Sequence, residues 1–191
     1  MISELLKNNE KYVKEHGHLF EELSKGQSPQ VTLVTCSDSR VPTRVLAEDN
    51  ENKLFVIENI GNQIKTAQGS VDYGVLHLKT PYLIILGHSD CGAVKAADGD
   101  YSEEPDAIIR ELELVKKAMG EGSVDERTKN NVDFQVSAAL ERYNHLVDNG
   151  KLTVLGMMMD FSGIYGEEKG KIHIINVNGS NDSEEIERWI K

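Results

Sequence analysis

Short unbroken apolar runs, separated by segments of helical periodicity, organise this chain. Runs bounded by polar turns are typical of strands that are buried on both faces of a parallel sheet. Five strands are predicted in this way, at 31–36, 54–57, 82–87, 152–159 and 172–177. Elsewhere the apolar residues recur every three or four positions, which predicts helices at 42–48, 70–79, 93–97, 105–119, 124–147 and 183–190.

The N-terminal segment is predicted to be helical and to stand apart from these strands. Apolar residues at roughly helical spacing over residues 2–24 indicate one or two helices, with a break at Gly17. Such an arm packs either on its own domain or on a partner subunit, and the spacing does not distinguish the two.

The order of the elements predicts the fold class. Strands alternate with helices, so we expect an α/β fold with a mostly parallel central sheet flanked by helices. The last two strands are close in sequence, and the fifth could therefore lie antiparallel at an edge. A chain of 191 residues is long enough for one core, so we expect a single domain over 1–191 with an N-terminal helical arm at 1–25.

Composition narrows the possible partners. The formal net charge is −11, from 32 acidic and 21 basic residues, which argues against a nucleic-acid surface and against binding to anionic membranes. No apolar run approaches the roughly 20 residues that span a bilayer, and the first residues lack a signal-peptide core. We therefore expect a cytoplasmic protein, in which the two cysteines are not a disulfide framework.

Each of the two cysteines lies at the end of a predicted buried strand or just beyond it. Cys36 ends the first run, and the third run is followed by His88 and then Cys91. Ligand sites of open α/β sheets lie at the carboxyl ends of the strands, so neighbouring strands would bring these three side chains to one point. Two thiolates and one imidazole form a tetrahedral zinc site with one open position.

Asp38 is close enough in sequence to Cys36 to reach the same metal. It could accept a hydrogen bond from zinc-bound hydroxide, or it could bind zinc itself and close the site. Arg40 could clamp Asp38 through a bidentate pair and hold it off the metal. A surface salt bridge would be the simpler interpretation if Cys36 were absent.

The motifs Cys36-Ser37-Asp38-Ser39-Arg40 and Gly87-His88-Ser89-Asp90-Cys91-Gly92-Ala93 resemble those of the β-class carbonic anhydrases. The similarity runs from about residue 31 to about residue 97 and continues more weakly through the last two strands. It implies one zinc ion per subunit on Cys36, His88 and Cys91, an Asp38–Arg40 dyad, and a homodimer or higher homo-oligomer. It also implies reversible hydration of carbon dioxide to bicarbonate and a proton by zinc-bound hydroxide.

Two features depart from the family pattern. Glu58 stands where the family usually has a basic residue, and the chain is compact between Asn62 and Gly69. It therefore lacks the insert that carries a substrate-facing glutamine in plant-like members.

Two alternatives remain at this stage. One is a hydrolase of carbonyl sulfide or carbon disulfide on the same scaffold, and the other is a non-catalytic, zinc-stabilised module that binds bicarbonate.

Overall fold

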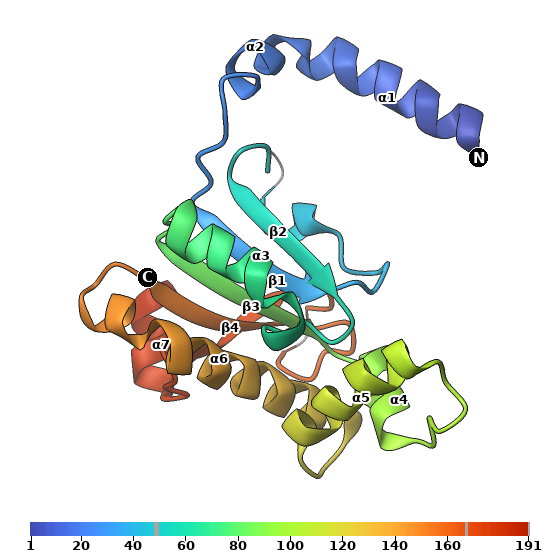
Figure 1. Ribbon diagram of the computed structural model, residues 1–191, viewed down its shortest axis with the longest axis vertical. Coiled ribbons are helices and arrows are strands. Elements are labelled where there is room, and N and C mark those ends of the chain that lie inside the picture. Colours follow the sequence, from blue (N-terminus) through green and yellow to red (C-terminus); the bar gives the residue numbers. More distant parts are fainter. Residues whose placement is uncertain (48–49, 167, 191) are drawn as a thin grey trace.

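A five-stranded sheet forms the centre of the computed structural model, which describes residues 1–47, 50–166 and 168–190 (Figure 1). The strand order is β2-β1-β3-β4-β5. The first four strands are parallel and β5 runs antiparallel to β4 at the edge, which confirms the predicted fold class. The strands are β1 (Val31–Cys36), β2 (Leu54–Asn59), β3 (Tyr82–His88), β4 (Thr153–Met159) and β5 (Ile172–Val177).

The helices lie close to their predicted positions. The N-terminal arm contains α1 (Ile2–His16), a 3-10 turn (Gly17–Leu19) and α2 (Phe20–Leu23), so the break falls at Gly17 as expected. α3 (Gln68–Asp72) continues into a π-helical turn (Tyr73–His77). The remaining helices are α4 (Gly92–Asp98), α5 (Asp106–Met119), α6 (Val124–Asp148) and α7 (Ser183–Ile190). Within the described residues no helix is long and apolar enough to cross a membrane.

The helix predicted at 42–48 is wrong in extent. The structure has only a 3-10 turn (Thr43–Val45), preceded by Pro42 in an extended conformation, and residue 48 lies outside the described residues. Val45 and Leu46 pack against the apolar face of the sheet. Tertiary contact, rather than helix propensity, therefore determines the path of this short segment.

The two faces of the sheet are buried under different elements, and successive strand residues alternate between them. On one face, Val34, Leu83 and Ile85 belong to a core that also contains Val132 and Val136 of α6. On the other face, the neighbouring residues Leu33, Ile84 and Leu86 pack with the segment around Val45 and with Ile186 of α7. Because both faces are covered, most residues of β1 and β3 are apolar, and the exceptions, Thr32, Thr35 and His88, are buried too.

Glycine allows α6 to approach the sheet closely. A Cβ atom built on Gly87 would lie 2.5 Å from Cγ2 of Val132 and 3.0 Å from the sulfur of Met158. No real side chain tolerates the first distance, so α6 packs directly on the backbone of β3 one residue before His88.

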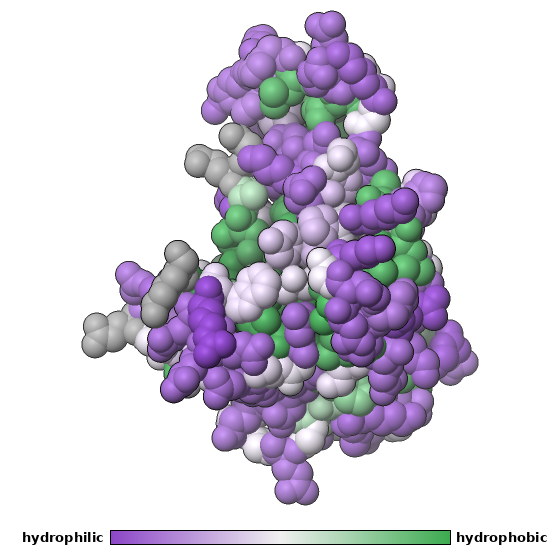
Figure 2. Space-filling model, turned by 90° about the vertical axis from the view of Figure 1, so that its left-hand side faces the viewer, coloured by the Kyte–Doolittle hydropathy of each residue, from purple (hydrophilic) through white to green (hydrophobic). Residues whose placement is uncertain are grey.

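The helix α1 extends away from the sheet and its covering helices (Figure 1). All residues of α1 are described, and none of them is buried. Its apolar residues Ile2, Leu5 and Leu6 are 65%, 57% and 62% exposed, and apolar patches are visible on the arm at the top of Figure 2. An amphipathic helix of this length is marginal alone in water, so this apolar stripe calls for a covering surface.

Candidate metal centre

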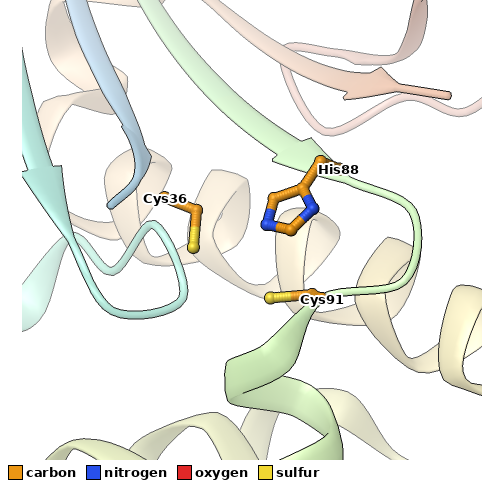
Figure 3. Close-up of side chains that lie close together, drawn as sticks. All are labelled: Cys36, His88 and Cys91. Carbon is orange, nitrogen blue, oxygen red and sulfur yellow. The ribbon is translucent and has the colours of Figure 1, made fainter. Parts of the chain in front are cut away.

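Three predicted ligands meet at the carboxyl edge of the sheet. Cys36 is the last residue of β1, His88 is the last residue of β3, and Cys91 directly precedes α4. The strands β1 and β3 are parallel neighbours, so their ends lie side by side. One potential ligand atom from each residue lies within 4.8 Å of the other two, and Figure 3 shows the three side chains pointing toward one another.

The three side chains are buried, and the side of the site that faces α4 and α5 is apolar. Cys36 is 5% exposed, whereas His88 and Cys91 are fully buried. The cysteines belong to a cluster with residues of α4 and α5, among them Val94, Leu112 and Val115. A metal ion here would be shielded from water on the side of these helices.

His88 has one ring nitrogen that is satisfied and one that is not. Nδ1 lies 3.0 Å from the carbonyl oxygen of Ser89. Because a carbonyl only accepts, Nδ1 must carry the proton, and Nε2 of the neutral ring keeps a free lone pair. Nε2 is buried and has no hydrogen-bond partner among the described residues. A buried polar atom without a partner is costly, unless a ligand satisfies it.

The two thiols differ in acidity because they interact. A hydrogen bond from Cys91 lowers the pKa of Cys36, although burial opposes this effect. The same contact, together with burial, raises the pKa of Cys91. One sulfur is thus favoured as a thiolate even before any cation is present, and backbone N–H groups of Ala93 and Val94 at the start of α4 also favour negative charge on Cys91.

These donors fit a zinc ion. Two sulfur atoms and one imidazole nitrogen are the ligand types that zinc prefers, and three protein ligands leave one position open. The unpartnered lone pair of Nε2 faces the thiols, and its fixed tautomer is the one that metal-binding histidines adopt when a carbonyl accepts from the other nitrogen.

Asp38 and Arg40 form the bidentate pair that the sequence suggested. Arg40 donates from Nε to Oδ1 of Asp38 at 2.9 Å and from Nη2 to Oδ2 at 2.8 Å. Oδ2 of Asp38 lies 3.7 Å from Nε2 of His88. The hydrogen bonds from Arg40 hold the pKa of Asp38 well below its usual range, against the opposing effect of partial burial. Asp38 is therefore an ionised acceptor beside the three predicted ligands.

The loop after β4 contributes residues that the sequence analysis missed. The ring of Phe161 lies 5.6 Å from the ring of His88 and 5.0 Å from the Arg40 guanidinium carbon. Its backbone N–H donates to Oγ of Ser89 at 2.7 Å. Asp160 accepts hydrogen bonds from the N–H groups of Ser162, Gly163 and Tyr165 and so shapes this loop. A lone aspartate after a strand was the only signal in the sequence.

Glu58 lies on β2, the edge strand, and its side chain is exposed. It is paired in register with Thr35, one residue before Cys36. The structure does not bring it into the cluster of potential metal ligands, at least as far as the described residues go.

Comparisons with known proteins support the arrangement. A family model described as carbonic anhydrase matches residues 31–165. A carbonic anhydrase of Synechococcus elongatus is 40% identical over 91 residues, which cover 44% of this chain and 34% of that protein. Carbonic anhydrase 2 of Mycobacterium tuberculosis is 28% identical over 169 residues, which cover 76% of this chain and 82% of that protein. The match thus spans about a third of the first of these relatives.

Solved structures share the fold. The β-carbonic anhydrase CcaA has a TM-score of 0.78 at 24% identity, covering 92% of this chain and 93% of that one. The Coccomyxa β-carbonic anhydrase in complex with acetazolamide has a TM-score of 0.77 at 22% identity, covering 97% of this chain and 90% of that one. At these identities the likeness concerns the fold alone.

Proposed function

Because the chain belongs to the β-carbonic anhydrase family, we propose that it catalyses the reversible hydration of carbon dioxide to bicarbonate and a proton with one zinc ion per subunit. Cys36, His88 and Cys91 are the proposed zinc ligands. The observation that carries the proposal is the buried Nε2 of His88, which has no partner among the described residues and faces two thiols.

Zinc bound there would supply a Lewis acid that lowers the pKa of a water molecule toward neutrality. The protein supplies the rest of the environment. Burial of the three ligand side chains excludes bulk water from one side and strengthens electrostatic interactions inside the site.

We propose that Asp38 orients the reacting oxygen. Its lowered pKa keeps it ionised at neutral pH, so it can accept a hydrogen bond but cannot donate one. Arg40 fixes both carboxylate oxygens of Asp38. In this orientation Oδ2 lies near Nε2 of His88, at the end of β3. An acceptor held in place in this way needs no reorganisation during the reaction.

A homodimer or larger homo-oligomer is proposed on the basis of α1. The stripe of Ile2, Leu5 and Leu6 is exposed on a helix that extends away from the sheet, and a second copy of the chain would cover it. One solved structure of similar fold is a tetrameric β-carbonic anhydrase from Sordaria macrospora. For location we propose the cytoplasm, where a reducing environment keeps both thiols free to bind metal.

The test is stopped-flow measurement of carbon dioxide hydration by the zinc-loaded protein between about pH 6 and 9, the window around the pKa of a zinc-bound water. We expect a rate well above that of buffer, and loss of that rate in Cys36→Ser. A zinc-loaded protein without activity would contradict the proposal and favour a binding module. Release of sulfide from carbonyl sulfide or carbon disulfide, without hydration of carbon dioxide, would favour the hydrolase instead.

A further inference from the structure

Arg40 makes a second set of contacts, to Asp90, through the edge of its guanidinium that Nη1 and Nη2 form. Nη1 donates to Oδ2 of Asp90 at 3.3 Å, and Nη2 donates to the backbone carbonyl oxygen of Asp90 at 3.1 Å. Nε and Nη2 meanwhile hold Asp38. A planar guanidinium that is held at both edges has a fixed orientation.

Asp90 itself is held firmly in an uncommon conformation. Its φ is +59°, in the left-handed region that glycine and asparagine enter most easily. Its backbone N–H donates to Oδ1 of Asp125, in the first turn of α6, at 2.8 Å. Its side chain is also paired with Lys95 of α4. Glycine would meet this backbone requirement equally well, so a glycine variant separates the contribution of the Asp90 carboxylate from that of its backbone.

We propose that Asp90 is a positioning residue, which holds the outer edge of Arg40 and thereby keeps the Asp38 carboxylate turned toward Arg40 instead of toward the metal. The consequence for the metal rests on the proposed function, because it presumes an ion on Cys36, His88 and Cys91. The contact between Asp90 and Arg40 does not depend on any metal.

The geometry explains how one aspartate controls the other. Oδ2 of Asp38 is 3.7 Å from Nε2 of His88, so it lies close enough to compete for an ion that these ligands would hold. Rotation away from Arg40 breaks two hydrogen bonds from the guanidinium and one from the Arg40 backbone N–H. If Arg40 were free to follow Asp38, the restraint would weaken. Asp90 and the face of Phe161 prevent this movement.

The size of the effect is limited by solvent. The side chains of Arg40 and Asp90 are 46% and 44% exposed, and exposed ion pairs are weak because water and salt screen them. We therefore expect changes of about two- to fivefold in the measured equilibria and rates, not loss of function.

The first experiment follows hydrogen exchange of the Arg40 Nε–H group by nuclear magnetic resonance in the metal-free protein, with Asp90→Gly and Asp90→Asn. Glycine and asparagine both tolerate positive φ, so both variants should fold. We expect exchange to be about two- to fivefold faster in Asp90→Gly and somewhat faster in Asp90→Asn. Lys95→Met is the matched control, because it removes the other partner of Asp90, and exchange should stay unchanged. Unchanged exchange in Asp90→Gly would overturn the proposal, whatever the protein catalyses.

The second experiment measures azide affinity of the cobalt-loaded protein from its visible absorption. If Asp38 binds the metal more often without Asp90, azide must displace it, and its affinity should fall about two- to fivefold in Asp90→Gly. Adding Asp38→Ala to that variant should restore the affinity. A loss that persists without Asp38, or no loss at all, would contradict the restraint on Asp38. Failure to bind cobalt would refute the proposed zinc site, while the exchange experiment would still decide the contact between Asp90 and Arg40.

Discussion

Local hydrogen bonds decide what each residue of the site can do. The carbonyl of Ser89 determines the tautomer of His88, and Arg40 fixes the orientation of the Asp38 carboxylate. In His88, Nδ1 makes the supporting hydrogen bond and Nε2 stays available as a potential ligand atom. In Asp38, Oδ2 both accepts a hydrogen bond from Arg40 and lies 3.7 Å from Nε2 of His88.

Replacing His88 by alanine should remove a zinc ligand. Because loss of groups that only support a ligand costs 10- to 100-fold in metal affinity, loss of the ligand itself should weaken zinc binding by at least about 100-fold. Competition with a chromophoric chelator measures this affinity. His173→Ala is the matched control, since His173 on β5 also has a buried Nε2 without a hydrogen-bond partner but is not among the clustered residues. Equal losses in both variants would argue against His88 as a ligand.

Asp160 is expected to stabilise the folded protein in a pH-dependent manner. Burial raises its pKa, but hydrogen bonds from backbone N–H groups outweigh this and lower it below the usual value. A lowered folded-state pKa gives stability that is present above the unfolded pKa of about 3.9 and is lost as pH falls through the folded value. Asp160→Asn should thus cost about 1–3 kcal/mol at pH 7.

Urea unfolding of both proteins at several pH values tests this. The difference between wild type and Asp160→Asn should be constant from pH 7 to about pH 5 and should shrink below about pH 4. A difference that grows on acidification would have the wrong sign and would refute the assignment.

At the scale of elements, the site depends on how tightly α6 and the sheet are packed. β3 carries His88 directly after Gly87, and α6 contacts the backbone at that glycine through Val132. The same helix presents Asp125 to the N–H group of Asp90. The position of α6 therefore affects both the end of β3 and the loop between His88 and Cys91.

Gly87→Ala should be destabilising because its methyl group would lie 2.5 Å from Cγ2 of Val132. Overpacking of this kind costs about 1–3 kcal/mol in the free energy of unfolding, and zinc affinity should fall as His88 is displaced. Thermal or urea unfolding measures the first effect and chelator competition the second. Gly69→Ala in α3 is the control, because nothing lies within 4 Å of its new Cβ; it should be neutral or slightly stabilising. Equal stability of Gly87→Ala and wild type would show that the contact is looser than described.

At the scale of the whole molecule, the arm has the least packing against the rest of the chain. α1 projects away from the sheet, and the sheet does not cover the apolar stripe of this helix. Whether another copy of the chain packs on this stripe in solution determines whether the protein is a monomer or an oligomer.

Leu5→Glu combined with Leu6→Glu should reduce the mass measured by sedimentation velocity, because it places two charges in the apolar stripe of α1. Lys7→Gln combined with Lys11→Gln changes the net charge by the same amount on the polar side of the helix and should leave the mass unchanged. An unaltered oligomer in the leucine variant would show that α1 is not the contact.

The sequence by itself determined the elements and the membership of the cluster. Unbroken apolar runs locate β1 and β3 within a residue, because a strand that is buried on both faces admits few polar side chains. Cys36, His88 and Cys91 were predicted because each stands at or just beyond the end of such a run. The failed helix at 42–48 lies where the pattern is too short to outweigh contact with the sheet.

Only the tertiary structure decided the contacts between residues that are distant in sequence. Asp90 was visible as a residue between two predicted ligands, but its contact with Arg40, fifty positions away, depends on where two loops meet. Phe161 lies over Arg40 and His88 for the same reason. Local patterns report burial and periodicity along the chain, whereas the direction of a loop side chain results from packing among separate elements. The pair of Asp38 and Arg40 was thus predicted from the sequence, whereas the contacts of Arg40 with Asp90 and Phe161 became visible only with the fold.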